Sequence, residues 1–210
     1  MFSRSTLGLM AALVTVLSWA ASFPLIGVAL GHFDPLPLAA TRFAIAACPA
    51  VIWLLIIRPP LPRVRDLARL ALGGAIGISI YNWLLNTGQQ TVSPGAASFI
   101  INTLPIWTGL LATLFLRERF GYRAWIATAI SFSGVFLIAQ GQPGEMRFGN
   151  GSSLILLASI LSASYFVLVR GLIARYGAGT CTCWTLITGA FWLSPWLPDG
   201  LAQLGTLPCR

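Results

Sequence analysis

Long apolar stretches dominate this chain, and short polar segments rich in arginine separate them. Seven of the stretches approach the about 17 to 25 residues that a helix needs to cross the hydrocarbon core of a bilayer. They cover residues 7–30, 36–57, 67–88, 95–116, 124–140, 152–169 and 180–197. The pattern predicts an all-α membrane protein, a polytopic bundle of about seven transmembrane helices. The first stretch is longer than the core of a signal peptide, so we expect an uncleaved first helix.

Polar residues inside these stretches are few and follow helical spacing. Four of them recur at intervals of three and four residues along the third stretch and the residue that follows it: Ser79, Asn82, Asn86 and Gln89. Such spacing places them on one face of a helix. A buried amide without a partner is costly, so this face should line the bundle interior or a water-filled cavity that binds a polar solute. The alternative is that these groups only hydrogen-bond one helix to another.

Further candidates for solute contact lie in the first, second and fourth stretches. They are Trp19, Ser22, Arg42, Asn102 and Trp107. Arg42 is the one charged residue well inside a stretch, roughly 9 Å along its helix from the outer end. Its guanidinium either reaches the headgroups or faces the bundle, where it would attract an anionic group. The prolines at 24 and 105 give either packing kinks or backbone groups open to a substrate.

Thirteen arginines and no lysine predict the orientation of the chain. If every stretch crosses the membrane, ten arginines fall on one side: Arg4, Arg58, Arg63, Arg65, Arg69, Arg117, Arg119, Arg123, Arg170 and Arg175. The other side receives only Arg147 and Arg210. Short loops rich in positive charge stay in the cytoplasm. We therefore predict a multi-pass protein of the inner (plasma) membrane with its amino terminus in the cytoplasm and its carboxyl terminus outside.

The composition excludes several classes of protein. With 57% hydrophobic and 9% charged residues, the chain has too little polar surface for a water-soluble globule of 210 residues. The net charge of +8 lies in the loops between stretches, so we expect contact with lipid headgroups and not with nucleic acid. Four cysteines form no CxxC pair, and the single histidine, His32, lies in a loop. We expect no enzyme, no cofactor and no metal site.

The sequence after a polar break at residues 142–151 resembles the beginning of the chain. A shift of 143 residues places Ala20 on Ala163 and Trp53 on Trp196 and aligns the apolar stretches on either side of the break. We predict a first repeat of five helices at 1–141, an outer linker at 142–151 and an incomplete second repeat at 152–210. A unit with an odd number of spans inserts upside down the second time, as in the inverted repeats of secondary transporters.

The segment 102–141 has a proline in the fourth stretch, a glutamate (Glu118) at its inner end, and a Ser-x-Ser-Gly-Val sequence near the end of the fifth. Other residues of the same pattern are Trp19, Phe23 and Pro24 in the first stretch, Pro35 and Arg42 in the second, and Tyr165 and Arg170 after the polar break. In their order and spacing, these residues resemble an EamA domain of the drug/metabolite transporter superfamily.

The resemblance implies two inverted five-helix domains that move metabolites, amino acids or drugs by alternating access. The chain differs from this pattern at Gly27, where relatives often carry lysine, and in its second repeat, which has two helices. We therefore expect a small-solute transporter that is a truncated product or assembles with a second copy. The alternative is a transport-inactive membrane fragment or a helical scaffold. No acidic residue lies inside a stretch, so no site for a coupling ion is predicted.

Overall fold

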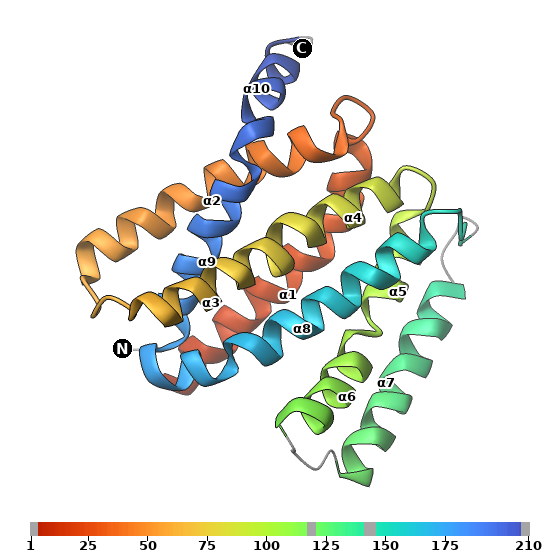
Figure 1. Ribbon diagram of the computed structural model, residues 1–210. Helices are drawn as coiled ribbons and strands as arrows, with labels where there is room; N and C mark the ends of the chain where they lie inside the picture. The colour runs from red at the N-terminus through yellow and green to blue at the C-terminus, as the bar shows by residue number, and fades with distance from the viewer. Residues whose placement is uncertain (1–3, 117–120, 141–145, 207–210) are drawn as a thin grey trace.

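The computed structural model describes residues 4–116, 121–140 and 146–206, and every regular element in these ranges is helical (Figure 1). Glu118, Arg117, Arg119 and Arg210 lie outside the described residues, as does part of the predicted linker.

Each predicted stretch corresponds to one helix or to helices joined end to end. The first two stretches are α1 (Arg4–Ala29) and α2 (Pro35–Ile57). The third consists of α3 (Val64–Gly74), a π-helical segment η1 (Ala75–Ile80) and α4 (Tyr81–Gln89). The fourth is divided into α5 (Pro94–Ile101) and α6 (Leu104–Leu116). The others are α7 (Tyr122–Gln140), α8 (Ser152–Tyr176) and α9 (Ala178–Leu193), which continues through the short 3₁₀ turn η2 (Ser194–Trp196) into α10 (Leu197–Gly205).

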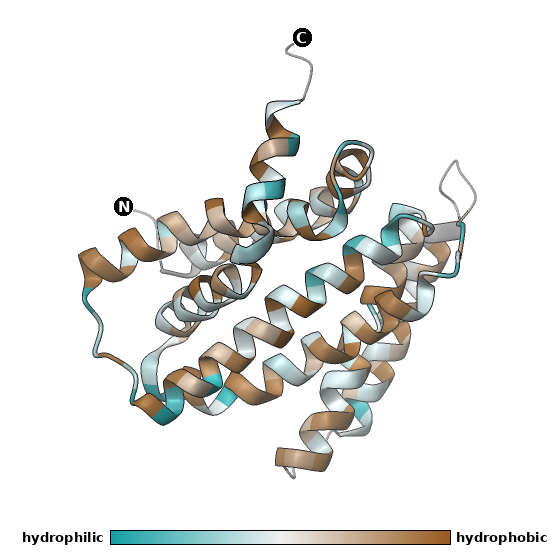
Figure 2. Ribbon diagram, turned by 45° about the horizontal axis from the view of Figure 1, so that its top comes forward, coloured by the Kyte–Doolittle hydropathy of each residue, from teal (hydrophilic) through white to brown (hydrophobic). Residues whose placement is uncertain are grey.

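Five of the described helical stretches are long and apolar enough to cross a membrane. They are Gly8–Ala29, Pro35–Ile57, Val64–Gln89, Pro94–Leu116 and Ser152–Tyr176. Brown, hydrophobic residues recur along the helices in Figure 2. These findings confirm an all-α membrane helix bundle. That α7, with 19 residues, and α9, with 16, also cross the membrane remains a prediction.

Local signals set several helix ends. Pro35 and Pro94 each begin a helix, where the N–H that proline lacks would have no helical partner. Ser93 caps α5, because its Oγ accepts a hydrogen bond from the Ala96 amide. Arg58, with a φ of 48°, ends α2 in the left-handed conformation. The chain therefore turns at the polar segments between the predicted stretches.

The helices after the polar break pack among those before it. α8 lies between α3–α4 on one side and α5–α6 on the other, and α9 packs against α2 and α3. Glycines allow this close approach, since a side chain on Gly73 or Gly77 would meet Tyr165 of α8, and one on Gly74 would meet Thr188 of α9. By contrast, α1 and α7 are peripheral: α1 contacts α4 and α5, and α7 packs on α5.

The direction of the helices agrees with the predicted shift. In Figure 1, α8 and α9 run opposite to α1 and α2. α9 begins at Ala178, which is 143 residues after Pro35, where α2 begins. The division of the chain into two repeats is not tested by this observation and remains a prediction.

Polar loops gather at the two ends of the bundle in the predicted sets. We call residues 30–35, 89–94 and 146–151 the pocket end, where the Ser93 amide donates to the Arg147 carbonyl oxygen at 3.2 Å. We call residues 58–66 and 170–178 the arginine-rich end, where the Arg63 amide donates to the Tyr176 hydroxyl at 3.2 Å. Which end faces the cytoplasm remains a prediction.

Candidate functional site

A polar cluster lies where α4 packs against α2. It contains three of the predicted residues, Arg42, Asn82 and Asn86. Asn86 has no exposed surface, and its Nδ2 donates to the Pro35 carbonyl oxygen across the helix interface at 2.9 Å. Asn82 is also buried, and its Nδ2 donates to the Ile78 carbonyl oxygen one turn earlier at 2.8 Å. One amide thus joins two helices, and the other returns to its own backbone.

Two buried polar atoms of this cluster lack a hydrogen-bond partner among the described residues, Nη1 of Arg42 and Oδ1 of Asn86. Outside the cluster, Oε1 of Gln89 at the pocket end and Oγ1 of Thr87 also lack one. Leaving a buried donor or acceptor unpaired costs about 1 to 3 kcal/mol. Such a cluster therefore suits water or a polar solute that completes its hydrogen bonds.

Arg42 is the charged member of the cluster. Its side chain is half-buried, and its guanidinium carbon lies 6.0 Å from the centre of the Phe43 ring. It also interacts electrostatically with Tyr81 on α4. This position agrees better with a guanidinium directed into the bundle than with one that extends to the headgroups.

A second polar cluster lies at the break between α5 and α6. Thr103 sits in the break, and its Oγ1 lies 3.1 Å from Oγ of Ser159 on α8. Trp107 donates from Nε1 to the same Thr103 oxygen at 3.1 Å. Asn102 is exposed, and its Nδ2 donates to the Ser98 carbonyl oxygen at 2.8 Å. The fourth stretch therefore breaks just before Pro105, and Trp107 lies in an interface with α8, apart from the α2–α4 cluster.

The two candidates on α1 lie elsewhere again. Trp19 is 63% exposed. Ser22 donates from Oγ to the Ser18 carbonyl oxygen of its own helix at 2.9 Å. The structure thus brings together Arg42, Asn82 and Asn86 and leaves the other four predicted residues on separate surfaces.

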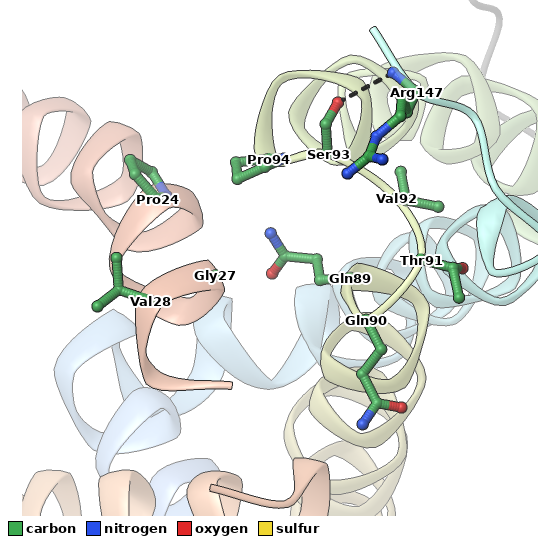
Figure 3. A pocket seen from close by; sticks show the side chains of 10 residues that line it. All are labelled: Pro24, Gly27, Val28, Gln89, Gln90, Thr91, Val92, Ser93, Pro94 and Arg147. Atoms are coloured by element: carbon green, nitrogen blue, oxygen red, sulfur yellow. Dashed lines mark hydrogen bonds between the residues drawn. The ribbon is translucent and has the colours of Figure 1, made fainter. Parts of the chain in front are cut away.

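An open pocket of about 410 Å³ lies at the pocket end, between α1 and the turn that joins α4 to α5 (Figure 3). It is lined by Pro24, Gly27, Val28, Gln89, Gln90, Thr91, Val92, Ser93, Pro94 and Arg147. Pro24 lies inside α1, which continues through it, and it forms part of the pocket wall. Gly27, where the sequence resemblance suggests lysine in relatives, lines the same wall.

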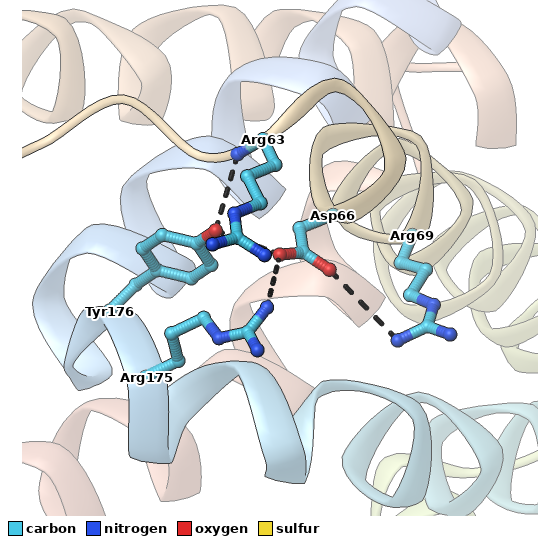
Figure 4. A network of polar contacts seen from close by, with 5 residues as sticks. All are labelled: Arg63, Asp66, Arg69, Arg175 and Tyr176. Carbon is cyan, nitrogen blue, oxygen red and sulfur yellow. Dashed lines mark hydrogen bonds and ion pairs between the residues drawn. The ribbon is translucent and has the colours of Figure 1, made fainter.

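A charged network that the sequence did not predict joins α3 to α8 at the arginine-rich end (Figure 4). The Asp66 carboxylate is 5% exposed and accepts hydrogen bonds from the Tyr176 hydroxyl at 2.7 Å and from Arg175 Nη1 at 2.9 Å. Arg69 lies 4.0 Å from its other oxygen. The only sequence signal for this network is an acidic residue in the first turn of a helix, surrounded by arginines.

The described residues contain no group of three or more His, Cys, Asp or Glu side chains that could hold a metal ion. Cys181 and Cys183 are buried in α9, and Cys48 is exposed on α2. The α2–α4 cluster therefore offers amides and a guanidinium, groups that can form hydrogen bonds and, for the guanidinium, carry charge.

Three relatives resemble most of this chain. An uncharacterized transporter, YdfC, of Bacillus subtilis is 34% identical over 88% of the chain and 60% of its own length. A probable terminal-alkyne amino-acid exporter of Streptantibioticus cattleyicolor is 34% identical over 94% of the chain and 66% of its own length. An uncharacterized transporter of Archaeoglobus fulgidus is 30% identical over 91% of the chain and 68% of its own length. The chain thus spans about two thirds of the length of these relatives. No solved structure gives a significant match.

The family model of the EamA-like transporters matches residues 6–140, which cover α1 to α7. This range contains the α2–α4 polar cluster and most of the pocket lining. The helix bundle, its polar interior and the sequence matches agree, and the chain belongs to the EamA-like transporter family.

Proposed function

We propose that this chain is a carrier that moves a small polar or amphipathic solute across the inner membrane by alternating access. One observation supports this above all others. The α2–α4 cluster holds a guanidinium nitrogen of Arg42 and an amide oxygen of Asn86 that are buried and lack partners among the described residues. In an apolar bundle, a static packing role would favour paired groups, whereas a binding site keeps free groups for its solute.

Arg42 is the residue to which we assign the main contact. A guanidinium in a low-dielectric site binds a carboxylate through two charge-assisted hydrogen bonds. Asn86 can accept from a solute donor through Oδ1 while its Nδ2 remains on Pro35. A solute that carries both a carboxylate and an N–H donor satisfies both residues, and the name of the relative from Streptantibioticus, an amino-acid exporter, agrees with such a solute.

Alternating access requires two states, and the proposed repeats supply a basis for them. We propose a first repeat at residues 1–141, an outer linker at 142–151 and the beginning of an inverted second repeat at 152–210. In this proposal, α8 and α9, which pack among α2 to α6, would form the interface between the two repeats beside the polar cluster. A second copy of the chain would supply further helices around this interface.

We propose four further contacts with the solute. They are Trp19, Ser22, Asn102 and Trp107. Trp107 and Asn102 flank the α5–α6 break, where freed backbone groups can meet a solute. Trp19 lies on a face of α1 that is open in this chain and would meet a solute only if another helix closes that face.

Reconstituted protein tests the carrier proposal. Proteoliposomes are preloaded with one unlabelled amino acid, and the same amino acid in labelled form is added outside. The labelled form should accumulate inside by counterflow. Replacement of Arg42 by Leu should lower this flux by about 10- to 100-fold, the effect of losing a charge-assisted hydrogen bond of about 1.5 to 3 kcal/mol. Arg42→Lys should retain part of the flux, because it keeps the charge.

Arg65→Gln is the matched control, because Arg65 is exposed on α3 at the arginine-rich end. It should leave the flux unchanged. If no member of a panel of amino acids and related carboxylates drives counterflow in the folded protein, the scaffold alternative is favoured. If Arg42→Leu transports as well as the parent chain, Arg42 is not part of the site.

A further inference from the structure

We propose that the pocket beside the α4–α5 turn is a separate binding site for an oxyanion group, with Arg147 as its cation. Its ligand class is the carboxylate-bearing solute of the proposed function, on which this inference rests. The site lies at one end of the bundle, whereas the α2–α4 cluster lies inside it. It would hold the solute before or after passage through the cluster.

The walls of the pocket come from three parts of the chain. Pro24 and Val28 on α1 form an apolar wall, and Pro94 at the start of α5 faces them. A side chain on Gly27 would come within 3.2 Å of Pro94, so glycine here keeps the two walls close together at that level. A volume of about 410 Å³ falls in the range of about 300 to 1,000 Å³ that is usual for small-molecule sites.

Arg147 is held at the rim by its backbone. Its amide donates to Ser93 Oγ at 3.3 Å, and its carbonyl oxygen accepts from the Ser93 amide at 3.2 Å. In Figure 3 the guanidinium extends from this anchor toward the gap that Gln89 enters from below. It is the charged member of the pocket lining, and no acidic side chain of the described ranges forms an ion pair with it.

Gln89 supplies the second polar group. It is 7% exposed and reaches from the end of α4 toward α1, where its Nε2 donates to the Phe23 carbonyl oxygen at 3.3 Å. Its Oε1 is one of the buried acceptors without a partner. A carboxylate on Arg147 and an ammonium or N–H group directed toward Gln89 match these two groups.

The pocket can be tested without any measurement of transport. Val28 is 71% exposed on the apolar wall, so a Val28→Cys thiol can react with charged reagents. Cys48 and Cys209 would be replaced by Ser in this background. The measured quantity is the rate ratio, the labelling rate of Val28→Cys by a negatively charged thiosulfonate divided by its rate with a positively charged one of similar size. Arg147 should raise this ratio. Arg147→Gln should lower this rate ratio by about two- to fivefold at low salt, as expected for loss of one charge several ångströms away.

The control and the solute arm follow from the same chemistry. Arg147→Lys should keep the rate ratio, and Arg65→Gln should not change it. Millimolar L-alanine should slow the labelling of Val28→Cys, and this protection should disappear in Arg147→Gln. Gln89→Leu should weaken protection while the rate ratio stays, because it removes a hydrogen-bond acceptor and no charge. An unchanged rate ratio in Arg147→Gln overturns the proposal.

A phosphate of the outer leaflet offers the same oxyanion chemistry as the solute. Labelling in vesicles of phosphatidylglycerol and in vesicles of phosphatidylethanolamine separates the two sources. Protection by L-alanine in both lipids supports the solute site. A labelling rate that changes with the lipid and is not altered by L-alanine overturns the solute site. If the protein transports solute but L-alanine does not protect Val28→Cys, the pocket proposal alone is refuted. If L-alanine protects Val28→Cys but no solute is transported, the carrier proposal alone is refuted.

Discussion

Asn86 combines a structural contact with a free acceptor on one side chain. Its Nδ2 ties α4 to the Pro35 carbonyl oxygen at the first residue of α2, while its Oδ1 has no partner among the described residues. Hydrogen bonds between membrane helices contribute modestly, about 0.5 to 2 kcal/mol. At the residue scale, removing this amide should therefore affect both stability and solute binding.

We predict that Asn86→Ala lowers the apparent Tm of the purified protein, because it removes the hydrogen bond to Pro35. A loss of about 1 kcal/mol in the free energy of unfolding lowers Tm by about 2 to 4 °C in a protein of this size. Thermal unfolding in detergent, followed by intrinsic tryptophan fluorescence, measures the shift. Asn102→Ala is the matched control, since its amide is exposed and bonds only within its own helix. Equal shifts for the two variants would contradict this interpretation of Asn86.

Sequence periodicity predicts the polar face of the third stretch, but it does not predict which face of α1 meets the other helices. Asn82, Asn86 and Gln89 stand out because their neighbours are apolar, so their shared face is readable. Thr15, Ser18 and Ser22 share one face of the first stretch, but the Thr15 and Ser22 hydroxyls bond to carbonyl oxygens of their own helix, so their spacing does not show which side meets other helices. The structure places Trp19 and Ser22 away from the α2–α4 cluster.

At the scale of elements, close helix packing depends on the glycines before and within η1. Gly77 and Gly73 of the GxxxG sequence face Tyr165 on α8, and Gly74 faces α9. Serine adds to this contact, because Ser79 Oγ donates to the Gly189 carbonyl oxygen at 3.0 Å. These contacts join both helices after the polar break, α8 and α9, to the core of the family-matched region.

We predict that Gly77→Ala destabilises the bundle, since its methyl group would overlap the Tyr165 side chain and force α8 away. The control is Gly171→Ala in α8, where a methyl group meets nothing within 4 Å. That change should be neutral or stabilising by up to about 1 kcal/mol. Apparent Tm values of the two variants provide the measurement. A Gly77→Ala protein as stable as Gly171→Ala would show that this helix contact is looser than described.

The Asp66 network is the polar connection between α3 and α8 at the arginine-rich end. We predict that Tyr176→Phe speeds hydrogen exchange of the amides of residues 63–69, because it removes the acceptor of the Arg63 amide and a donor to Asp66. Hydrogen exchange read by mass spectrometry checks this. Tyr122→Phe is the control, since Tyr122 is exposed on α7. Unchanged exchange in Tyr176→Phe would mean that α3 and α8 are held together without this hydroxyl.

Hydropathy and arginine placement predicted where the helices lie, but side-chain contacts between distant elements escaped both signals. α2 and α8 each begin within one residue of the first residue of the predicted stretch. The break in the fourth stretch falls at Asn102–Thr103, because Pro105 lacks the N–H that would bond to the Ile101 carbonyl oxygen. The Ile100 and Ile101 carbonyl oxygens instead accept from the hydroxyls of Thr103 and of Ser159 on α8, and the sequence does not identify Ser159. Asp66 pairs with residues more than 100 positions away, and nothing in its local sequence identifies that partner.

At the scale of the whole molecule, the two ends of the bundle differ in chemistry. The arginine-rich end is joined by the buried Asp66 carboxylate, whereas the other end holds an open pocket with Arg147 at its rim. In the carrier proposal, access opens at one of these ends while it closes at the other. The central claim is that the arginine-rich end faces the cytoplasm and the pocket faces outward.

Thiol labelling in intact cells tests this claim most directly. Single cysteines at Leu61, in the exposed loop between α2 and α3, and at Gln90, in the α4–α5 turn, mark the two ends. In a background with Cys48 and Cys209 replaced by Ser, a membrane-impermeant maleimide should label Gln90→Cys from outside. It should label Leu61→Cys only after the membrane is permeabilised. Labelling of Leu61→Cys, with protection of Gln90→Cys, would contradict the account.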